Sequence, residues 1–171
     1  MKKIILSVLS FAVALSLCAC GSGEQKKEIP QIEPTELLTI DDVTAYAGYI
    51  PVIKETTRDG NVSSVLYVGE TLGQYDPVEV KFTQFSDDMG RQQIYNYYEK
   101  QKSTRQDAET VDSLGQEAYI AYPTIHVYDC GCLIEITAGS GAGEEQRQLL
   151  RQLAINAAAR LEEIMPDYST E

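Results

Sequence analysis

The stretch TIHVYDCGCLIEI, residues 124–136, constrains the fold of this chain more than any other. Cys130 and Gly131 suit the two central positions of a tight hairpin turn, where glycine supplies a positive φ. In that register His126 faces Glu135 across two antiparallel strands. One sheet face then carries an apolar set: Ile125, Val127, Ile134 and Ile136. The other carries a half-polar set: His126, Tyr128, Leu133 and Glu135. A slip by one residue would bury His126 and Glu135, so the register is well specified.

Further strands are predicted on both sides of this hairpin. Two β-rich runs flank Asp59-Gly60, which is a strong signal for a second hairpin. Pro51 near the start of the first run favours an edge position in the sheet. The alternating residues 77–85 predict another strand, and residues 109–122 add a short one before the hairpin at 124–136.

Three helices are predicted. A short one lies between Thr39, a good N-cap, and Gly48, a plausible stop. A second follows Ser86 and runs to about Ser103, with Ile94, Tyr97 and Tyr98 on one face. The clearest is residues 144–165, whose apolar stripe is continuous: Leu150, Leu153, Ala154, Ala157, Leu161 and Ile164.

These elements predict a single α+β domain over residues 37–166, followed by a tail at 167–171. The expected architecture is an antiparallel sheet of about five to six strands. Two long helices and one short N-terminal helix are expected to pack on one face of it.

The N-terminus has the features of an export signal. Lys2 and Lys3 precede an apolar run, interrupted only by three serines, that is too short to span a bilayer comfortably. The following Leu17-Cys18-Ala19-Cys20 resembles the bacterial lipobox. The resemblance implies a lipoprotein signal peptide at 1–19, cleavage before Cys20, and diacylglycerol on the Cys20 thiol. The alternative is an ordinary signal peptide that leaves Cys20 as a bare thiol.

Charge bears on the expected partners. Loss of Lys2 and Lys3 with the leader leaves 12 basic against 26 acidic side chains, a net charge of −14. Such a surface repels nucleic acid and anionic lipid. Residues 20–36 are expected to form the lipid anchor and a flexible tether, whose reach would be roughly 20 Å. The same residues would also suit a tail with no spacing role. The domain is therefore expected at the outer face of the cell membrane, attached only through Cys20.

Two segments carry a second resemblance. LLTIDDVTAYAGY, at 37–49, and VDSLGQEAYIAY, at 111–122, resemble segments of small uncharacterised lipoproteins from Gram-positive bacteria. Those proteins are similar in layout to the PsbP-like α/β sandwich. The resemblance implies an extracytoplasmic α+β module, and it brings no catalytic residues with it.

The two cysteines of the hairpin allow three interpretations. In the first, Cys130 and Cys132 form a disulfide, which the exported compartment permits. In the second, they bind a metal together with His126. In the third, they are free thiols without a role. For a metal site, no fourth ligand stands at a recognisable spacing. No metal or other cofactor is therefore predicted.

Catalytic interpretations are weak. His126 is the only histidine, so any Ser-His or Cys-His hydrolase would have to use it, yet a histidine opposite a glutamate is typical of a cross-strand polar pair. Acidic doublets such as Asp41-Asp42 and Glu144-Glu145 begin predicted helices, where they offset the helix dipole. The glycine spacing at 139–143 fails the dinucleotide pattern. No catalytic residue is predicted.

Two functions remain open. The first is a non-enzymatic, membrane-anchored module that binds an envelope protein or a small ligand. Its candidate binding face, if that side of the sheet stays uncovered, consists of His126, Tyr128, Leu133 and Glu135. The alternative is an extracytoplasmic thiol-redox or hydrolytic enzyme centred on Cys130, Cys132 and His126.

Overall fold

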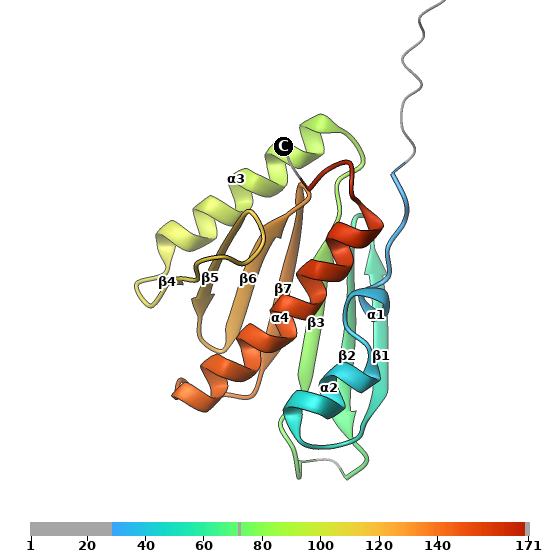
Figure 1. The fold of residues 1–171 in the computed structure, drawn as a ribbon, viewed down its shortest axis with the longest axis vertical. Coiled ribbons are helices and arrows are strands. Elements are labelled where there is room, and N and C mark those ends of the chain that lie inside the picture. Colours follow the sequence, from blue (N-terminus) through green and yellow to red (C-terminus); the bar gives the residue numbers. More distant parts are fainter. Residues whose placement is uncertain (1–28, 72, 170–171) are drawn as a thin grey trace, which may run out of the picture.

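A computed structural model describes residues 29–71 and 73–169 of the chain. The predicted leader, Cys20 and the tether as far as residue 28 lie outside the described residues. The described part forms one antiparallel sheet with helices on both sides (Figure 1). The strands are β1 (Pro51–Asp59), β2 (Val62–Gly69), β3 (Val78–Thr83), β4 (Glu109–Thr110), β5 (Glu117–Ala121), β6 (Thr124–Asp129) and β7 (Cys132–Ala138). The helices are α1 (Pro34–Leu37), α2 (Ile40–Ala47), α3 (Asp88–Thr104) and α4 (Glu144–Ile164).

The fold is α+β in class, as predicted, but its sheet has more strands than expected. The described residues contain seven strands in the order β1-β2-β3-β7-β6-β5-β4, rather than five to six. The two-residue strand β4 pairs with β5, and it is too short to show an alternating pattern in the sequence. β1 lies at one edge of the sheet, as Pro51 indicated.

The hairpin at 124–136 has the predicted register. His126 pairs with Glu135 and Val127 pairs with Ile134. At the turn, Cys130 has φ +50° and Gly131 has φ +75°, so both central residues adopt the positive φ of a type I′ turn. In the first hairpin Asp59 pairs with Val62, which places the turn one residue later than Asp59-Gly60.

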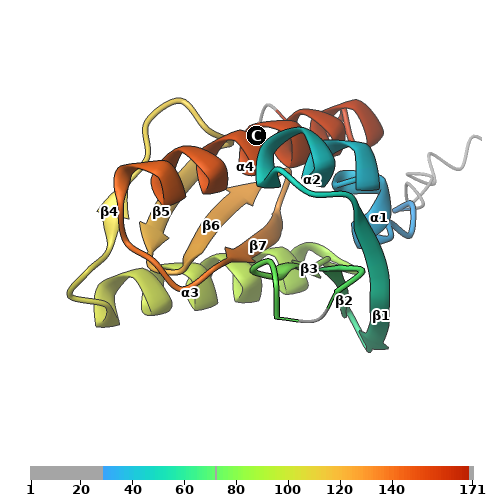
Figure 2. The same ribbon diagram turned by 90° about the horizontal axis from the view of Figure 1, so that it is seen from below.

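The helices cover both faces of the sheet, which corrects the prediction that they share one face. α1, α2 and α4 lie on one side and α3 lies alone on the other (Figure 2). The second face must be covered because it carries large buried side chains of its own, including Tyr119 and Leu133. Tyr98 of α3 packs on Tyr119 with ring centroids 5.2 Å apart, and Ile94 of the same helix is also buried. Tyr97, predicted on the same helix face, is 42% exposed. Among the described residues, no helix combines the length and apolarity needed to cross a membrane.

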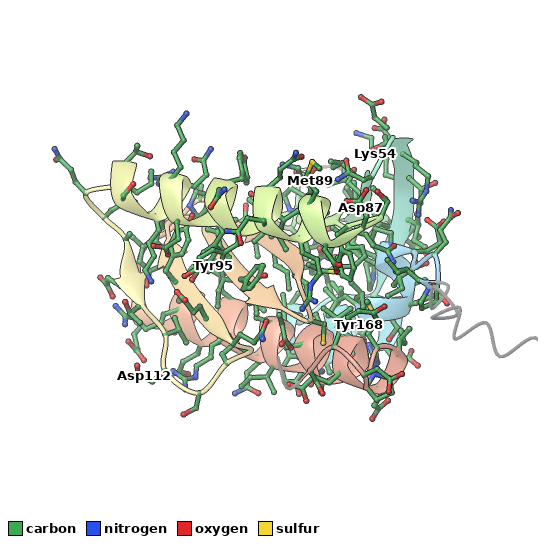
Figure 3. All side chains as sticks on the ribbon, turned by 90° about the horizontal axis from the view of Figure 1, so that it is seen from above. Lys54, Asp87, Met89, Tyr95, Asp112 and Tyr168 are labelled. Carbon is green, nitrogen blue, oxygen red and sulfur yellow. The ribbon has the colours of Figure 1, made fainter. Side chains whose placement is uncertain are left out.

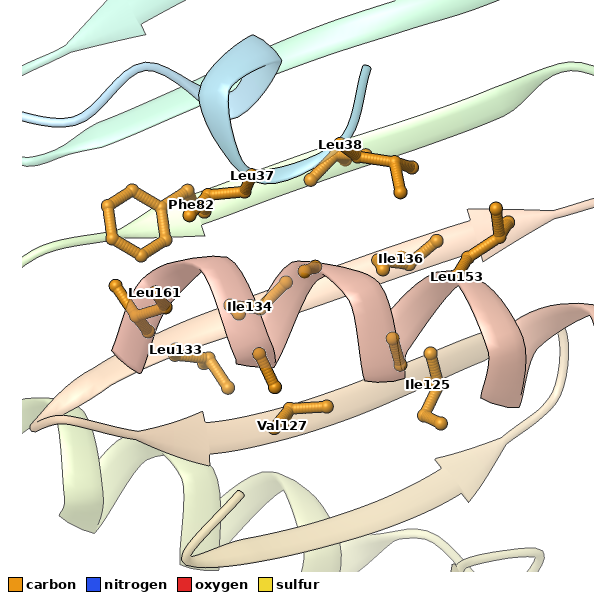
Figure 4. Packing of buried hydrophobic residues seen from close by; sticks show 14 of the residues in the cluster. Leu37, Leu38, Phe82, Ile125, Val127, Leu133, Ile134, Ile136, Leu153 and Leu161 are labelled. Carbon is orange, nitrogen blue, oxygen red and sulfur yellow. The ribbon is translucent and has the colours of Figure 1, made fainter. Parts of the chain in front are cut away.

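The larger core lies between α4 and the sheet (Figure 4). The predicted α4 stripe is fully buried at Leu150, Leu153, Ala154, Ala157 and Leu161, and Ile164 is partly buried. The strands contribute the apolar set predicted for that face, together with Val80 and Phe82 of β3. Each fully buried leucine contributes roughly 1.5–3 kcal/mol of transfer free energy.

The segment before α1 belongs to the folded domain, not to a tether. Ile32 is fully buried, and its backbone N–H donates to the side chain of Gln84 at 3.3 Å. The Gln84 amide in turn donates to the carbonyl of Pro30, and Arg58 donates to the carbonyl of Ile32 at 3.1 Å. The domain boundary predicted at Leu37 therefore moves to about Ile29. Two isoleucines, Ile29 and Ile32, among polar residues and prolines give no periodic signal, so the sequence pattern missed this segment.

The predicted tail at 167–171 is also partly docked. The ring of Tyr168 packs edge-on against Phe85 at 5.3 Å between centroids. Tyr168 lies at the same end of the molecule as Asp87 and Met89, which belong to the start of α3 (Figure 3). The ring of Tyr168 thus packs against Phe85 and Arg91, at the start of α3.

Candidate functional site

The two hairpin cysteines are free thiols, and both are fully buried. Burial raises the pKa of Cys130 to about 12, and the adjacent Asp129 carboxyl acts in the same direction. Burial also raises the pKa of Cys132 to about 12. Both thiols therefore remain protonated near neutral pH, whereas the thiolate is the form that attacks disulfides and carbonyls.

The sheet separates Cys132 from His126. Side chains alternate along a strand, so Cys132 points to the same face as Ile134, toward α4. His126 pairs with Glu135 and points to the face covered by α3. A nucleophile and its base must lie within hydrogen-bonding reach. The structure does not bring the Cys132–His126 pair of the enzyme alternative together.

The state of the thiols can be measured directly. In the full chain with Cys18→Ser and Cys20→Ser, we expect an aromatic disulfide reagent to titrate no thiol quickly in the native state, because both remaining sulfurs are buried. It should titrate both Cys130 and Cys132 after denaturation without reductant. If thiols become available only after reductant is added, the pair is a disulfide and the free-thiol account is wrong.

The half-polar face predicted as a binding surface is assembled but covered. His126 is 9% exposed and Leu133 is 1% exposed. The imidazole of His126 stacks on the ring of Tyr119 with centroids 4.4 Å apart. Tyr128 contacts Tyr95 and Tyr98 of α3. An open binding face over these residues would require this side of the sheet to be uncovered. Because α3 covers it, that requirement is not met.

Glu135 forms the polar centre beneath α3. Its carboxylate lies 3.3 Å from Nδ1 of His126 and 2.8 Å from Nζ of Lys81. Burial alone would raise the pKa of Glu135, but the hydrogen bonds from His126 and Lys81 outweigh it and the pKa is lowered. The carboxylate stays ionised and paired, which is a structural role.

An open space does exist beside the covered face. We call it the α3 groove: it lies between α3 and the place where β5 begins and β6 ends, with a volume of about 690 Å³. Its lining residues are Asp88, Arg91, Gln92, Tyr95, Gln116, Glu117 and Tyr128. The α3 wall uses positions i, i+3, i+4 and i+7, which lie along one side of a helix. Tyr95 extends from the side of α3 that faces the strands (Figure 3).

Fixed contacts hold both walls of the α3 groove. The Tyr95 hydroxyl donates to Glu117 at 3.0 Å, and Nζ of Lys102 lies 3.4 Å from the other oxygen of that carboxylate. The rings of Tyr95 and Tyr128 are 5.0 Å apart at 59°. The guanidinium of Arg91 lies over the Phe85 ring at 5.2 Å.

A second cleft, of about 1200 Å³, lies beside residues 29–33, the segment before α1. We call this segment the N-terminal arm. Three of its polar side chains already serve the fold. Gln84 holds the arm, Arg58 pairs with Glu33 at 2.8 Å, and Asp87 accepts the N–H of Gly90 at 2.7 Å as the N-cap of α3. The α3 groove is the candidate site, because two tyrosines and five planar polar side chains surround one open space there.

Sequence reasoning missed the α3 groove. The predicted helix contained the spacing of Asp88, Arg91, Gln92 and Tyr95, which could have marked a polar helix side. The opposite wall comes from residues 116–128, and no sequence pattern shows that the two segments face each other. Among the described residues, no cluster of three or more His, Cys, Asp or Glu side chains could hold a metal ion. Comparisons of the chain with protein-family models, with curated proteins and with solved structures find no match.

Proposed function

We propose that this chain is a lipid-anchored protein of the outer face of the cell membrane, and that its domain is a non-enzymatic binding module. The α3 groove is the binding site in this proposal. The observation that carries it is the placement of two tyrosines and five planar polar side chains around one open space. The enzyme alternative has less support, because its thiols are buried and its histidine lies across the sheet from Cys132.

The anchor part of the proposal is supported by the leader and by the docked arm. Leu17-Cys18-Ala19-Cys20 resembles a lipobox, and two acyl chains suffice for stable membrane attachment. Eight residues lie between Cys20 and Ile29. The nine steps along the chain span at most about 30 Å when fully extended. The end of the domain where the arm enters would therefore lie close to the membrane.

Metabolic labelling tests the anchor. Cells that express the chain with radiolabelled palmitate should yield labelled protein in the membrane fraction. Cys20→Ser should abolish the label, because it removes the thiol that is modified. Cys18→Ser is the matched control, and it should keep the label. Equal labelling of wild type and Cys20→Ser would contradict the assignment.

A further inference from the structure

We propose that the α3 groove binds an uncharged saccharide, with a sugar ring against Tyr95 and Tyr128 and its hydroxyls bonded to the planar polar side chains. This inference rests on the proposed function, since it names the ligand class of the same site.

The polar part of the lining matches vicinal hydroxyls. It consists of two carboxylates (Asp88, Glu117), two carboxamides (Gln92, Gln116) and one guanidinium (Arg91). Each of these groups presents two hydrogen-bonding atoms in one plane. Neighbouring hydroxyls of a sugar offer donors and acceptors at a matching spacing, so one planar side chain can bond two of them at once.

The aromatic part of the lining matches the other side of a sugar ring. Tyr95 and Tyr128 are half-buried, so each ring leaves part of its surface open to the groove. A pyranose carries C–H groups on its faces, and these pack well against an aromatic ring. A tyrosine also keeps a polar tip, which suits a ligand that is apolar on one side and polar on the other.

Other ligand classes fit less well. A mostly apolar ligand would bury the carboxylates and amides without hydrogen-bond partners, which is costly. An anionic ligand would meet the carboxylates of Asp88 and Glu117. The nearby cations are already engaged, Lys102 with Glu117 and Arg91 over the Phe85 ring. The volume of about 690 Å³ lies within the roughly 300–1,000 Å³ of small-molecule sites. An uncharged polyhydroxylated ligand satisfies all three conditions.

The walls are also held in place before a ligand arrives. The Tyr95–Glu117 hydrogen bond joins the α3 wall to the strand wall. The backbone N–H of Gln116 donates to the carbonyl of Tyr128 at 3.1 Å. A rigid site loses less entropy on binding, which helps weak individual hydrogen bonds to yield measurable affinity.

The chain offers a matched pair of variants for the test. Gln92 and Gln93 are adjacent, exposed glutamines on α3, but only Gln92 lines the groove. Gln92→Ala removes one planar group from the site, and Gln93→Ala makes the same chemical change outside it. Alanine is a good helix former, so neither change should unfold α3.

The probes are N,N′-diacetylchitobiose, maltose, cellobiose and mannobiose, titrated by ligand-observed NMR into the full chain carrying Cys20→Ser. We expect at least one disaccharide to bind and to show saturation transfer from tyrosine ring protons. Gln92→Ala should weaken that binding about five- to tenfold, while Gln93→Ala leaves it unchanged.

If none of the four probes binds at a concentration of about 10 mM, the inference is overturned. A dissociation constant on the order of that concentration is the weakest useful affinity. Equal binding by the Gln92→Ala and Gln93→Ala variants would overturn it too, because the sugar would then lie elsewhere. The Cys20→Ser background removes the anchor from this assay. Failure here therefore leaves the palmitate result standing, and failure of palmitate labelling leaves the groove assay interpretable.

Discussion

Replacement of Asp42 by alanine is expected to lower the free energy of unfolding by about 2–3 kcal/mol near pH 7, because it removes a partly buried ion pair and part of a helix cap. Asp42 is 8% exposed and lies in the first turn of α2. Both of its carboxylate oxygens receive hydrogen bonds from the guanidinium of Arg160 on α4. Asn156, also on α4, donates to it at 3.0 Å.

The same carboxylate completes the cap of α2. It accepts a hydrogen bond from the backbone N–H of Thr39 at 2.8 Å, and the backbone N–H of Asp42 donates to the Thr39 hydroxyl at 3.3 Å. Alanine would therefore remove half of a capping box and leave the Arg160 guanidinium unpaired. The loss would loosen the contact between α2 and α4.

The contribution of Asp42 should depend on pH. Burial alone would raise its pKa, but the hydrogen bonds from Arg160 and Thr39 lower the pKa to about 2. A carboxyl whose pKa is lower in the folded state stabilises the fold above its unfolded pKa of 3.8. That contribution, about 2 kcal/mol, should be lost as the pH falls from 4 to 2.

Asp41→Ala is the matched control, because Asp41 is the neighbouring acidic residue of the same helix turn and is exposed. It should lose only the dipole interaction, about 0.3–1 kcal/mol. Urea unfolding of the two variants at pH 7 and pH 3 gives the comparison. Equal losses for Asp41→Ala and Asp42→Ala would show that the Arg160 contact contributes little.

Asp129→Asn should have the opposite effect and stabilise the protein by about 2–3 kcal/mol at pH 7.5. Asp129 is 1% exposed at the end of β6. Burial raises its pKa to about 6, and the nearby carboxyl of Glu162 adds to the rise. The hydrogen bond from the backbone N–H of Cys130, at 2.9 Å, does not compensate. Asparagine keeps that acceptor and removes the charge.

The sign of the pH dependence follows from the raised pKa of Asp129. The folded state holds the proton more tightly than the unfolded state, so the penalty is absent below about pH 4 and complete above about pH 6. The gain from Asp129→Asn should therefore vanish at pH 4. Glu70→Gln, which removes an exposed negative charge, should change stability by less than about 0.5 kcal/mol at either pH. A gain from Asp129→Asn that is equal at pH 4 and pH 7.5 would contradict the raised pKa.

Local sequence signals predicted the local structure well. The turn at Cys130-Gly131 and the alternation on either side of it gave the register of β6 and β7, because one slip would exchange the buried and half-polar sets. Thr39 and Gly48 gave the ends of α2. The helix after β3 was also predicted, although Asp87 rather than Ser86 caps it.

Arrangement in three dimensions was harder to predict. A helical pattern shows that one side of α3 is buried, but it does not show which face of the sheet buries it. The placement of α3 determined how far the predicted binding face is exposed. His126 and Leu133 became buried, and Tyr128 and Glu135 became half-buried. The α3 groove depends on the same placement, so it could not be predicted before the fold was known.

Mass spectrometry of the protein recovered from the membrane fraction tests the central claim of an exported, lipid-anchored module most directly. The account predicts an N-terminal peptide that begins at Cys20 and carries the added mass of diacylglycerol on its sulfur. Recovery of the intact chain from Met1 in the cytosol would contradict it.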